Sequence, residues 1–235
     1  MTAIWNREWK GYFHTPVGYV FMGVFLLLSG ILFDAQILQT RSGDLLTLIG
    51  QMSYLWMLLC PVLTMRLMSE ERQKHTEELL LSSPVSLPGI VMGKYLAAIS
   101  VQMLSVLLTL VYVLIVHMYG TVYPGEVMTG YIGFLLQGWA FIALDLFMAS
   151  LTASQVTAFL AAFGANLILW MVDMVSANAS ETIRSILNFF SLYMRNEPFL
   201  MGQLSFASIL FDVCTALFFL ILTVFWMDRR RRRGA

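Results

Sequence analysis

The chain has 235 residues, of which 59% are hydrophobic and only 12% are charged. A soluble globular domain carries about 25% charged residues, so this composition excludes a soluble domain and indicates a protein whose solvent is lipid. The 14 Lys and Arg residues balance the 14 Asp and Glu residues. The net charge therefore indicates no partner, and only the distribution of charge along the chain is informative.

The first 13 residues predict an amphipathic helix. Apolar and aromatic side chains recur near helical spacing from Ile4 to Phe13. The charged side chains lie elsewhere on the helical wheel: Arg7, Glu8 and Lys10. Such a helix rests its apolar face in the headgroup region of a membrane. A secretory signal peptide is excluded, because the segment carries Glu8 and has no apolar core or small-residue cleavage site.

Six later segments are long and apolar enough to cross a membrane, which takes about 20 mostly apolar residues. The run from 127 to 172 is too long for one crossing, and the polar residues 150–155 divide it into two. We therefore expect an all-α membrane protein with one domain over residues 1–235. Its six transmembrane helices are expected near residues 17–33, 48–68, 95–118, 128–149, 155–175 and 206–227.

Lys and Arg residues concentrate on one side of the predicted membrane. With the N-terminus inside, the cytoplasmic side carries eleven of them: Arg7, Lys10, Arg66, Arg72, Lys74, Lys94 and Arg229 to Arg233. The outer side carries three: Arg41, Arg184 and Arg195. Positive charge marks the cytoplasmic side, so both termini are expected there. The run Arg229–Arg233 directly follows the last span, which favours a headgroup anchor over a nucleic-acid-binding patch.

The stretch between the second and third spans, residues 65–84, is the most informative part of the chain. It holds seven charges in 20 residues: Arg66, Glu70, Glu71, Arg72, Lys74, Glu77 and Glu78. Glu70 and Lys74 have the i,i+4 order that favours a helix. The apolar Leu79–Leu81 needs a partner or interface to bury it, and Pro84 ends the helix. We interpret the stretch as a helix that docks a partner protein; a solvated loop without a partner is the alternative.

The chain contains no recognisable catalytic, metal-binding or nucleotide-binding motif. Residues 89–95 resemble a phosphate-binding loop only faintly. Their glycines are separated by three residues instead of four, and Tyr95 stands where a Mg²⁺-binding hydroxyl is required. Lys94 is interpreted as a positive anchor at the membrane edge. We therefore expect no enzymatic site and no bound cofactor, with ATP and Mg²⁺ held by a separate subunit if ATP drives the protein.

Three residues within the spans are candidates for a pathway or gating role. Asp145 lies near the cytoplasmic end of the fourth span and Asp212 near the outer end of the sixth. Carboxylates inside a membrane are functional candidates. The alternative is that these two shallow groups reach the headgroups or fill a polar gap between helices. Pro61 is expected to kink the second span close to the charged stretch and to serve as a joint that transmits motion.

The outer segment 176–205 carries an apolar stripe at helical spacing. The stripe consists of Ile183, Ile186, Leu187, Phe190, Tyr193 and Met194. It predicts a short amphipathic helix in the outer leaflet before the sixth span. Such a helix either gates an exit path or closes the end of the bundle, and the sequence leaves both interpretations open.

Four stretches together resemble the ABC-2 type permeases, and most closely the gliding-motility-type permease subunits. They are residues 5–20, residues 61–94, residues 150–155 and residues 190–202. The second stretch is the most specific, with Glu70-Glu71-Arg72 followed by Thr76-Glu77-Glu78-Leu79-Leu80. The chain departs from the family at two positions. His75 replaces the usual Gly before the Thr, and Asp145 stands where the end of the fourth span is usually uncharged.

The resemblance implies a six-helix bundle of the type V exporter kind, forming half of an ATP-driven exporter in a bacterial cytoplasmic (inner) membrane. A cytoplasmic ABC ATPase would dock on the helix between the second and third spans. The docking residues would be Glu70, Glu71, Arg72, Lys74, His75, Thr76, Glu77, Glu78, Leu79 and Leu80. The expected partners also include a second permease chain, with an identical chain favoured over a paralogue. Membrane lipid and an extracytoplasmic auxiliary subunit complete the set, and nucleic acid is not expected.

Two other functions fit parts of the pattern. A non-transporting mechanotransmission subunit would pass ATPase movement to an outer partner, and the sequence does not separate it from an exporter. A secondary transporter would usually show inverted repeats and an ion site at the midplane, and neither is visible. The cargo of an exporter is left open among lipids, peptides, drugs and polysaccharides.

Overall fold

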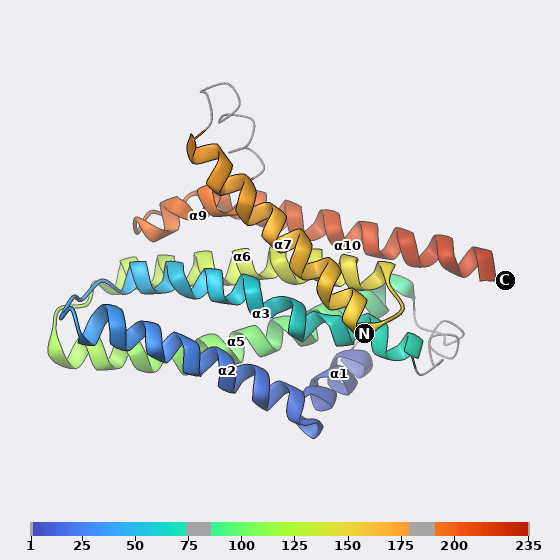
Figure 1. The fold of residues 1–235 in the computed structure, drawn as a ribbon, viewed down its shortest axis with the longest axis horizontal. Helices are drawn as coiled ribbons and strands as arrows, with labels where there is room; N and C mark the ends of the chain where they lie inside the picture. The colour runs from blue at the N-terminus through green and yellow to red at the C-terminus, as the bar shows by residue number, and fades with distance from the viewer. Residues whose placement is uncertain (1, 74–85, 179–190, 235) are drawn as a thin grey trace.

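The computed structural model describes residues 2–73, 86–178 and 191–234, and all regular structure in these ranges is helical (Figure 1). The predicted all-α fold is therefore confirmed. The elements are α1 (Thr2–His14), α2 (Pro16–Phe33), the π-helical turn η1 (Asp34–Leu38), α3 (Leu45–Gln73), α5 (Leu87–Tyr119), α6 (Pro124–Leu151), α7 (Gln155–Asn178), α9 (Leu192–Leu200) and α10 (Phe206–Gly234).

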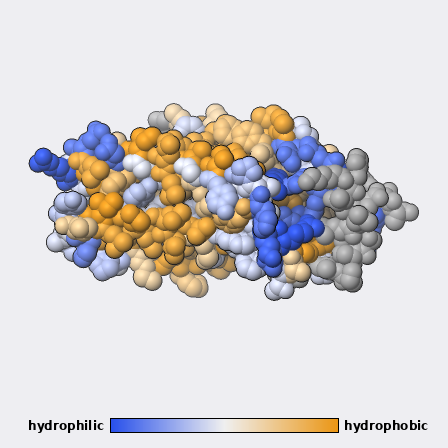
Figure 2. Space-filling model, turned by 90° about the horizontal axis from the view of Figure 1, so that it is seen from below, coloured by the Kyte–Doolittle hydropathy of each residue, from blue (hydrophilic) through white to orange (hydrophobic). Residues whose placement is uncertain are grey.

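Six segments of these ranges are long and apolar enough to cross a membrane, as predicted. They are Pro16–Leu38, Leu45–Gln73, Leu87–Tyr119, Pro124–Leu151, Gln155–Val172 and Phe206–Arg232. Figure 2 shows a broad apolar band across one face of the molecule, with hydrophilic side chains toward both ends. Side chains that face outward along the band are apolar because the surrounding lipid offers them no hydrogen bonds.

Local sequence signals set several helix boundaries. Proline stands in the first turn of α2, α5 and α6, where its missing N–H would have no intrahelical acceptor. Ser191 caps α9, because its Oγ accepts a hydrogen bond from the backbone N–H of Met194 at 2.9 Å. After α9 the chain turns at Gly202, whose φ of +72° favours glycine.

α6 is the central helix of the bundle. It packs against α3, α10, α7, α9 and α5, and it is the most buried of the six membrane helices. Two of its glycines make this possible. A Cβ on Gly133 would lie 2.6 Å from Cβ of Phe199, and a Cβ on Gly138 would lie 1.9 Å from Nε2 of Gln102. Glycine at these positions therefore lets α9 and the side chain of Gln102 in α5 approach the α6 backbone closely.

The two ends of the bundle differ. One end carries α1, the last turns of α3, the first turns of α5 and the C-terminal turns of α10 (Figure 1), and we call it the charged end. The other end carries η1, the last turns of α5, and α9, and we call it the opposite end. The structure thus brings the predicted interfacial helix, the base of the charged stretch and the arginine run to the same end.

α1 is a helix, as predicted, and packs mainly against α5. Its aromatic side chains form a continuous row, with ring centroids 6.4 Å apart for Trp5 and Trp9 and 4.6 Å apart for Trp9 and Phe13. The indole N–H of Trp5 donates to Oγ of Ser100 at 3.0 Å. The row suits an interface between lipid and water, because an indole combines an apolar body with a polar N–H.

α9 is a short helix directly before the sixth span, where the sequence predicts short outer helices. It packs against α6, with Phe199 fully buried and Asn196 donating to Oε1 of Gln137 at 2.5 Å. Tyr193 and Met194 of the predicted apolar stripe lie in α9. The other four stripe residues fall in 179–190, outside the described residues.

Candidate functional site

The candidate site lies at the charged end, where the end of α3 meets α1 and the start of α5. Six charged side chains surround a pocket of about 230 Å³ there: Arg7, Glu8, Arg66, Glu70, Glu71 and Lys94. They come from three helices that are separated by long stretches of sequence. The ion pairs among them connect the base of the charged stretch to the rest of the bundle.

Lys94 is the buried centre of this cluster. The residue is only 1% exposed, although it carries a charge. Its Nζ lies 3.0 Å from Oε2 of Glu71 and 3.3 Å from Oε1 of Glu8, and it donates to the backbone carbonyl of Leu67. A buried ammonium group needs such partners, because an unpaired buried charge is very unfavourable. The expected role of Lys94 as an anchor at the membrane edge is therefore wrong.

Arg7 joins the same two carboxylates from the solvent side. Its Nη2 lies 2.7 Å from Oε1 of Glu8 and also pairs with Glu71. Partial burial acts to lower the pKa of Arg7, but the two carboxylates outweigh it and leave the pKa above its usual value. Glu8 and Glu71 are thus each shared between a buried and an exposed cation.

A second set of contacts joins the C-terminal part of α1 to an earlier part of α3. Arg66 pairs with Glu70, and its Nη1 donates to Oγ1 of Thr15 at 2.5 Å. The Tyr12 hydroxyl donates to the carbonyl of Leu63 at 2.9 Å, and burial raises the pKa of this hydroxyl well above its usual value. α1 is therefore attached to α3 at several points.

Arg72 connects α3 to a fourth part of the chain. The residue is 8% exposed, and its Nη1 donates to the backbone carbonyl of Thr152 at 2.5 Å. Thr152 lies in the polar turn between α6 and α7, which sequence reasoning had identified only as the boundary between two spans. The end of α3 thus contacts α1, α5 and the α6–α7 turn.

The structure covers part of the predicted docking residues. Glu70, Glu71 and Arg72 are described, and all three make contacts within the chain. They lie in the last turns of α3. The other seven predicted residues lie outside the described residues: Lys74, His75, Thr76, Glu77, Glu78, Leu79 and Leu80.

Pro61 lies inside α3, five residues before Arg66 and ten before Glu71, and α3 is bridged to α7 near this position. Proline lacks the N–H that would bond to the carbonyl of Met57. The side-chain amide of Asn166 donates to that carbonyl at 3.1 Å instead. Sequence reasoning missed Asn166, and the signal that could have found it is an asparagine in the apolar fifth span, since polar groups there need a partner.

Asp145 lies beside the Pro61 turn. The side chains of Cys60 and Asn166 are its polar neighbours, and the residue is 0% exposed. Asp212 in α10 is 1% exposed. The alternative that these carboxylates reach the headgroups is therefore wrong, because both are enclosed by the bundle. The carboxyl group of Asp212 makes no hydrogen bond to any described residue, and the structure places Asp145 next to the candidate joint.

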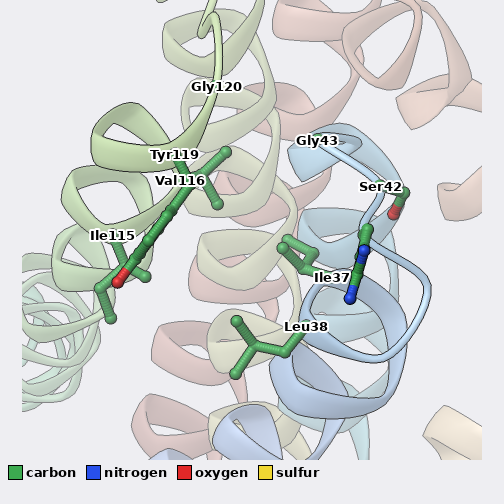
Figure 3. Close-up of a pocket in the computed structure, with 9 residues that line it drawn as sticks. Ile37, Leu38, Ser42, Gly43, Ile115, Val116, Tyr119 and Gly120 are labelled. Carbon is green, nitrogen blue, oxygen red and sulfur yellow. The ribbon is translucent and has the colours of Figure 1, made fainter.

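Two further pockets lie away from the charged end. One of about 380 Å³ is lined mostly by apolar side chains, and Figure 3 shows Ile37 and Leu38 projecting toward Val116 and the α5 end. Another of about 440 Å³ borders the Asn196–Gln137 pair and the stacked rings of Tyr54 and Tyr193, whose centroids are 4.3 Å apart. Among the described residues, no group of three or more His, Cys, Asp or Glu side chains is placed to hold a metal ion.

The chain matches a known protein family. Residues 17–227 match the family model described as ABC-2 family transporter protein. The match begins in the first turn of α2 and extends into α10, so it includes most or all of each membrane helix. A comparison with curated proteins finds no match.

Proposed function

Because the chain belongs to the ABC-2 transporter family, we propose that it is the membrane-spanning permease subunit of an ATP-driven exporter. The family implies a partnership with a cytoplasmic ABC ATPase, which carries the nucleotide site. In this proposal the stretch from Glu70 to Leu81 receives the movement of the ATPase, and the chain itself hydrolyses nothing.

The observation that carries the proposal is the set of contacts at the end of α3. A segment pushed by a partner transmits force only if its base is attached to the elements that must move. Lys94 attaches that base to α5, Tyr12 and Arg66 attach it to α1, and Arg72 attaches it to the α6–α7 turn. Movement of the stretch that follows Gln73 is therefore passed to α3, α5, α6 and α7, and to α1.

Pro61 gives this movement a place to occur within α3. A proline inside a helix weakens the local hydrogen-bond ladder and allows a change of angle. At this joint the side-chain amide of Asn166 in α7 donates a hydrogen bond to the carbonyl of Met57 in α3 at 3.1 Å. We propose that α3 bends at this point during transport, and that Asp145, which is enclosed beside it, responds to the bend.

α7 is the proposed contact with a second permease chain. Its apolar segment is the least buried of the six, and Val156, Leu160 and Ile168 are 66%, 58% and 64% exposed. Lipid or another helix can cover such a face. The small residues Thr157 and Gly164 on the same helix are not buried by the bundle, and small side chains suit close helix packing. We propose a dimer with an identical chain, in a bacterial cytoplasmic membrane with both termini in the cytoplasm.

The kinship to the gliding-motility-type subunits is part of the proposal. It rests on the likeness of residues 61–94 and of the approach to the sixth span. The mechanotransmission alternative shares the ATPase contact and differs only in what the outer side does. Transport into vesicles separates the two, because only an exporter moves a substrate.

The test is purification from native membranes in mild detergent. The proposal expects a soluble chain with a Walker A motif to co-purify in a fixed ratio, and the complex to hydrolyse ATP. Reconstitution in vesicles then asks whether candidate lipids, peptides, drugs or glycans are transported. A chain that purifies as an active transporter without any ATPase would contradict the proposal.

A further inference from the structure

A small pocket at the charged end lies between the last turns of α10 and the α6–α7 turn. It encloses about 250 Å³ and is lined by Leu151, Ala153, Trp226, Arg229 and Arg230. The two arginines follow Trp226 by three and four residues, so the three side chains share one face of α10. Leu151 and Ala153 form the facing wall.

The electrostatics of this pocket favour an anion. Arg229 and Arg230 are exposed, and neither makes an ion pair with any described residue. The nearest acid along the helix, Asp228, pairs instead with Arg232 at 2.8 Å. Two arginines and a tryptophan therefore line the pocket, and guanidinium and indole N–H groups are hydrogen-bond donors without acceptor capacity. A phosphate group offers the matching acceptors, and arginine pairs with it in bidentate fashion.

The position of the pocket favours a lipid over a soluble anion. Trp226 stands at the end of the apolar part of α10, where tryptophan marks the boundary between hydrocarbon and headgroups. Apolar side chains on both sides face outward, with Phe225 and Val156 63% and 66% exposed. A ligand whose phosphate meets the arginines therefore has its remainder beside a lipid-facing surface. An anionic phospholipid has this construction, and an acidic soluble protein does not.

The pocket also lies next to a contact of the α3 end, which belongs to the candidate functional site. Thr152 lies between the two turn residues that line the pocket, and its carbonyl accepts the hydrogen bond of Arg72 at 2.5 Å. A headgroup bound between α10 and the turn would hold the turn in place from the other side. The position of the turn fixes the acceptor for Arg72, and so the bound lipid would steady the end of α3.

We propose that this pocket binds the headgroup of an anionic phospholipid and that the bound lipid stabilises the α6–α7 turn against the end of α3. Lipid binding is independent of the proposed function. The effect of the lipid on coupling rests on the proposed function, because coupling requires the ATPase.

Lipid binding is tested on the full chain in nanodiscs of phosphatidylcholine with a minor fraction of phosphatidylglycerol, in which one or the other lipid is brominated. Bromine quenches tryptophan fluorescence at contact, and the difference between the wild type and Trp226→Phe isolates the signal of Trp226. We expect brominated phosphatidylglycerol to quench Trp226 more strongly than brominated phosphatidylcholine at the same mole fraction. Equal quenching by the two lipids would overturn the proposal.

A matched pair of variants separates a site from general surface charge. Arg229→Gln/Arg230→Gln removes two charges from the pocket, and Arg231→Gln/Arg232→Gln removes two charges from the same helix end outside it. The preference for the anionic lipid should fall on the order of tenfold in the first variant and largely persist in the second. An equal loss in both would reduce the site to a diffuse basic surface. Displacement of the brominated anionic lipid by inorganic phosphate would assign the pocket to a free anion, against the proposal.

The effect on coupling is read from the assembled complex with its ATPase. The anionic lipid should raise ATP hydrolysis in the wild type and in Arg231→Gln/Arg232→Gln, and should have no effect in Arg229→Gln/Arg230→Gln. All three should recover the same amount of ATPase. An unchanged lipid response in the pocket variant would overturn the regulatory part. Failure of any chain to recover an ATPase counts against the proposed function instead, and leaves the quenching result to decide the lipid site.

Discussion

Lys94→Met should destabilise the charged end more than any other change of a single cation there. Methionine keeps most of the volume and apolar length of the lysine side chain but removes the ammonium group. Glu8 and Glu71 then lose their buried partner, and the carbonyl of Leu67 loses a donor. The perturbation is therefore electrostatic and leaves packing nearly unchanged.

The expected cost follows from burial. Removing one partner of a buried ion pair costs about 3–5 kcal/mol. Lys94 is 1% exposed, but the side chains of Glu8 and Glu71 are 18% and 13% exposed and both keep Arg7 as a partner. We therefore expect the lower end of the range, about 3 kcal/mol. For a chain of this length that lowers the melting temperature by roughly 6–12 °C.

Thermal unfolding in mild detergent measures the effect, with Lys10→Met as the matched control. Lys10 is an exposed residue of α1 that makes no ion pair with any described residue, so its variant should melt with the wild type. A cycle with Glu71→Gln tests the assignment further, because the double variant should lose less than the sum of the single losses. If Lys94→Met melts no lower than Lys10→Met, Lys94 is not the centre of the cluster.

Three other changes give separate readouts of the same unfolding measurement. Asn166→Leu leaves the carbonyl of Met57 without its side-chain donor and should cost about 1–3 kcal/mol of stability. In a Pro61→Ala background residue 61 regains its N–H, so the cost of Asn166→Leu should shrink. An equal cost in both backgrounds would show that Asn166 does not compensate for the proline. Tyr12→Phe removes the bond to Leu63 and should cost about 1 kcal/mol, and a neutral result would mean that α1 is held by its ion pairs alone. Gly133→Ala places a Cβ 2.6 Å from Cβ of Phe199 and should destabilise the contact between α9 and α6 by about 1–3 kcal/mol. The control is Gly164→Ala, where a Cβ would meet nothing within 4 Å. Similar melting of the two variants would contradict the close packing of α9 on α6.

The sequence predicts the membrane helices well because hydrophobic length is a one-dimensional property. A helix that crosses a bilayer needs a long apolar run, and no knowledge of its neighbours is required to find it. The same holds for the end of the bundle at which charge collects, since it depends only on counting basic residues. All six helices and the position of the charged stretch between the second and third are therefore readable from the chain alone.

Partner choice is not readable in the same way. Lys94 looks like a membrane-edge anchor because its carboxylate partners stand far away in sequence, at Glu8 and Glu71. Asn166 and Pro61 lie on different spans, so only the hydrogen bond from Asn166 to the carbonyl of Met57 shows that one compensates for the other. Asp145 was expected to be shallow from its place near a helix end. It is enclosed because α3 and α7 cover that end of α6, which is a property of packing and not of position along the chain.

Recovery of the ATPase after charge reversal in the docking stretch is the most direct measurement of the proposed coupling. Glu77→Lys/Glu78→Lys reverses two charges of residues 65–84, and Glu126→Lys/Glu197→Lys reverses two exposed charges elsewhere in the chain, on α6 and α9. Both variants should insert in the membrane in wild-type amounts. The docking variant should lose most of the co-purifying ATPase and the control variant none. Full recovery of an active ATPase with Glu77→Lys/Glu78→Lys would contradict docking through this stretch.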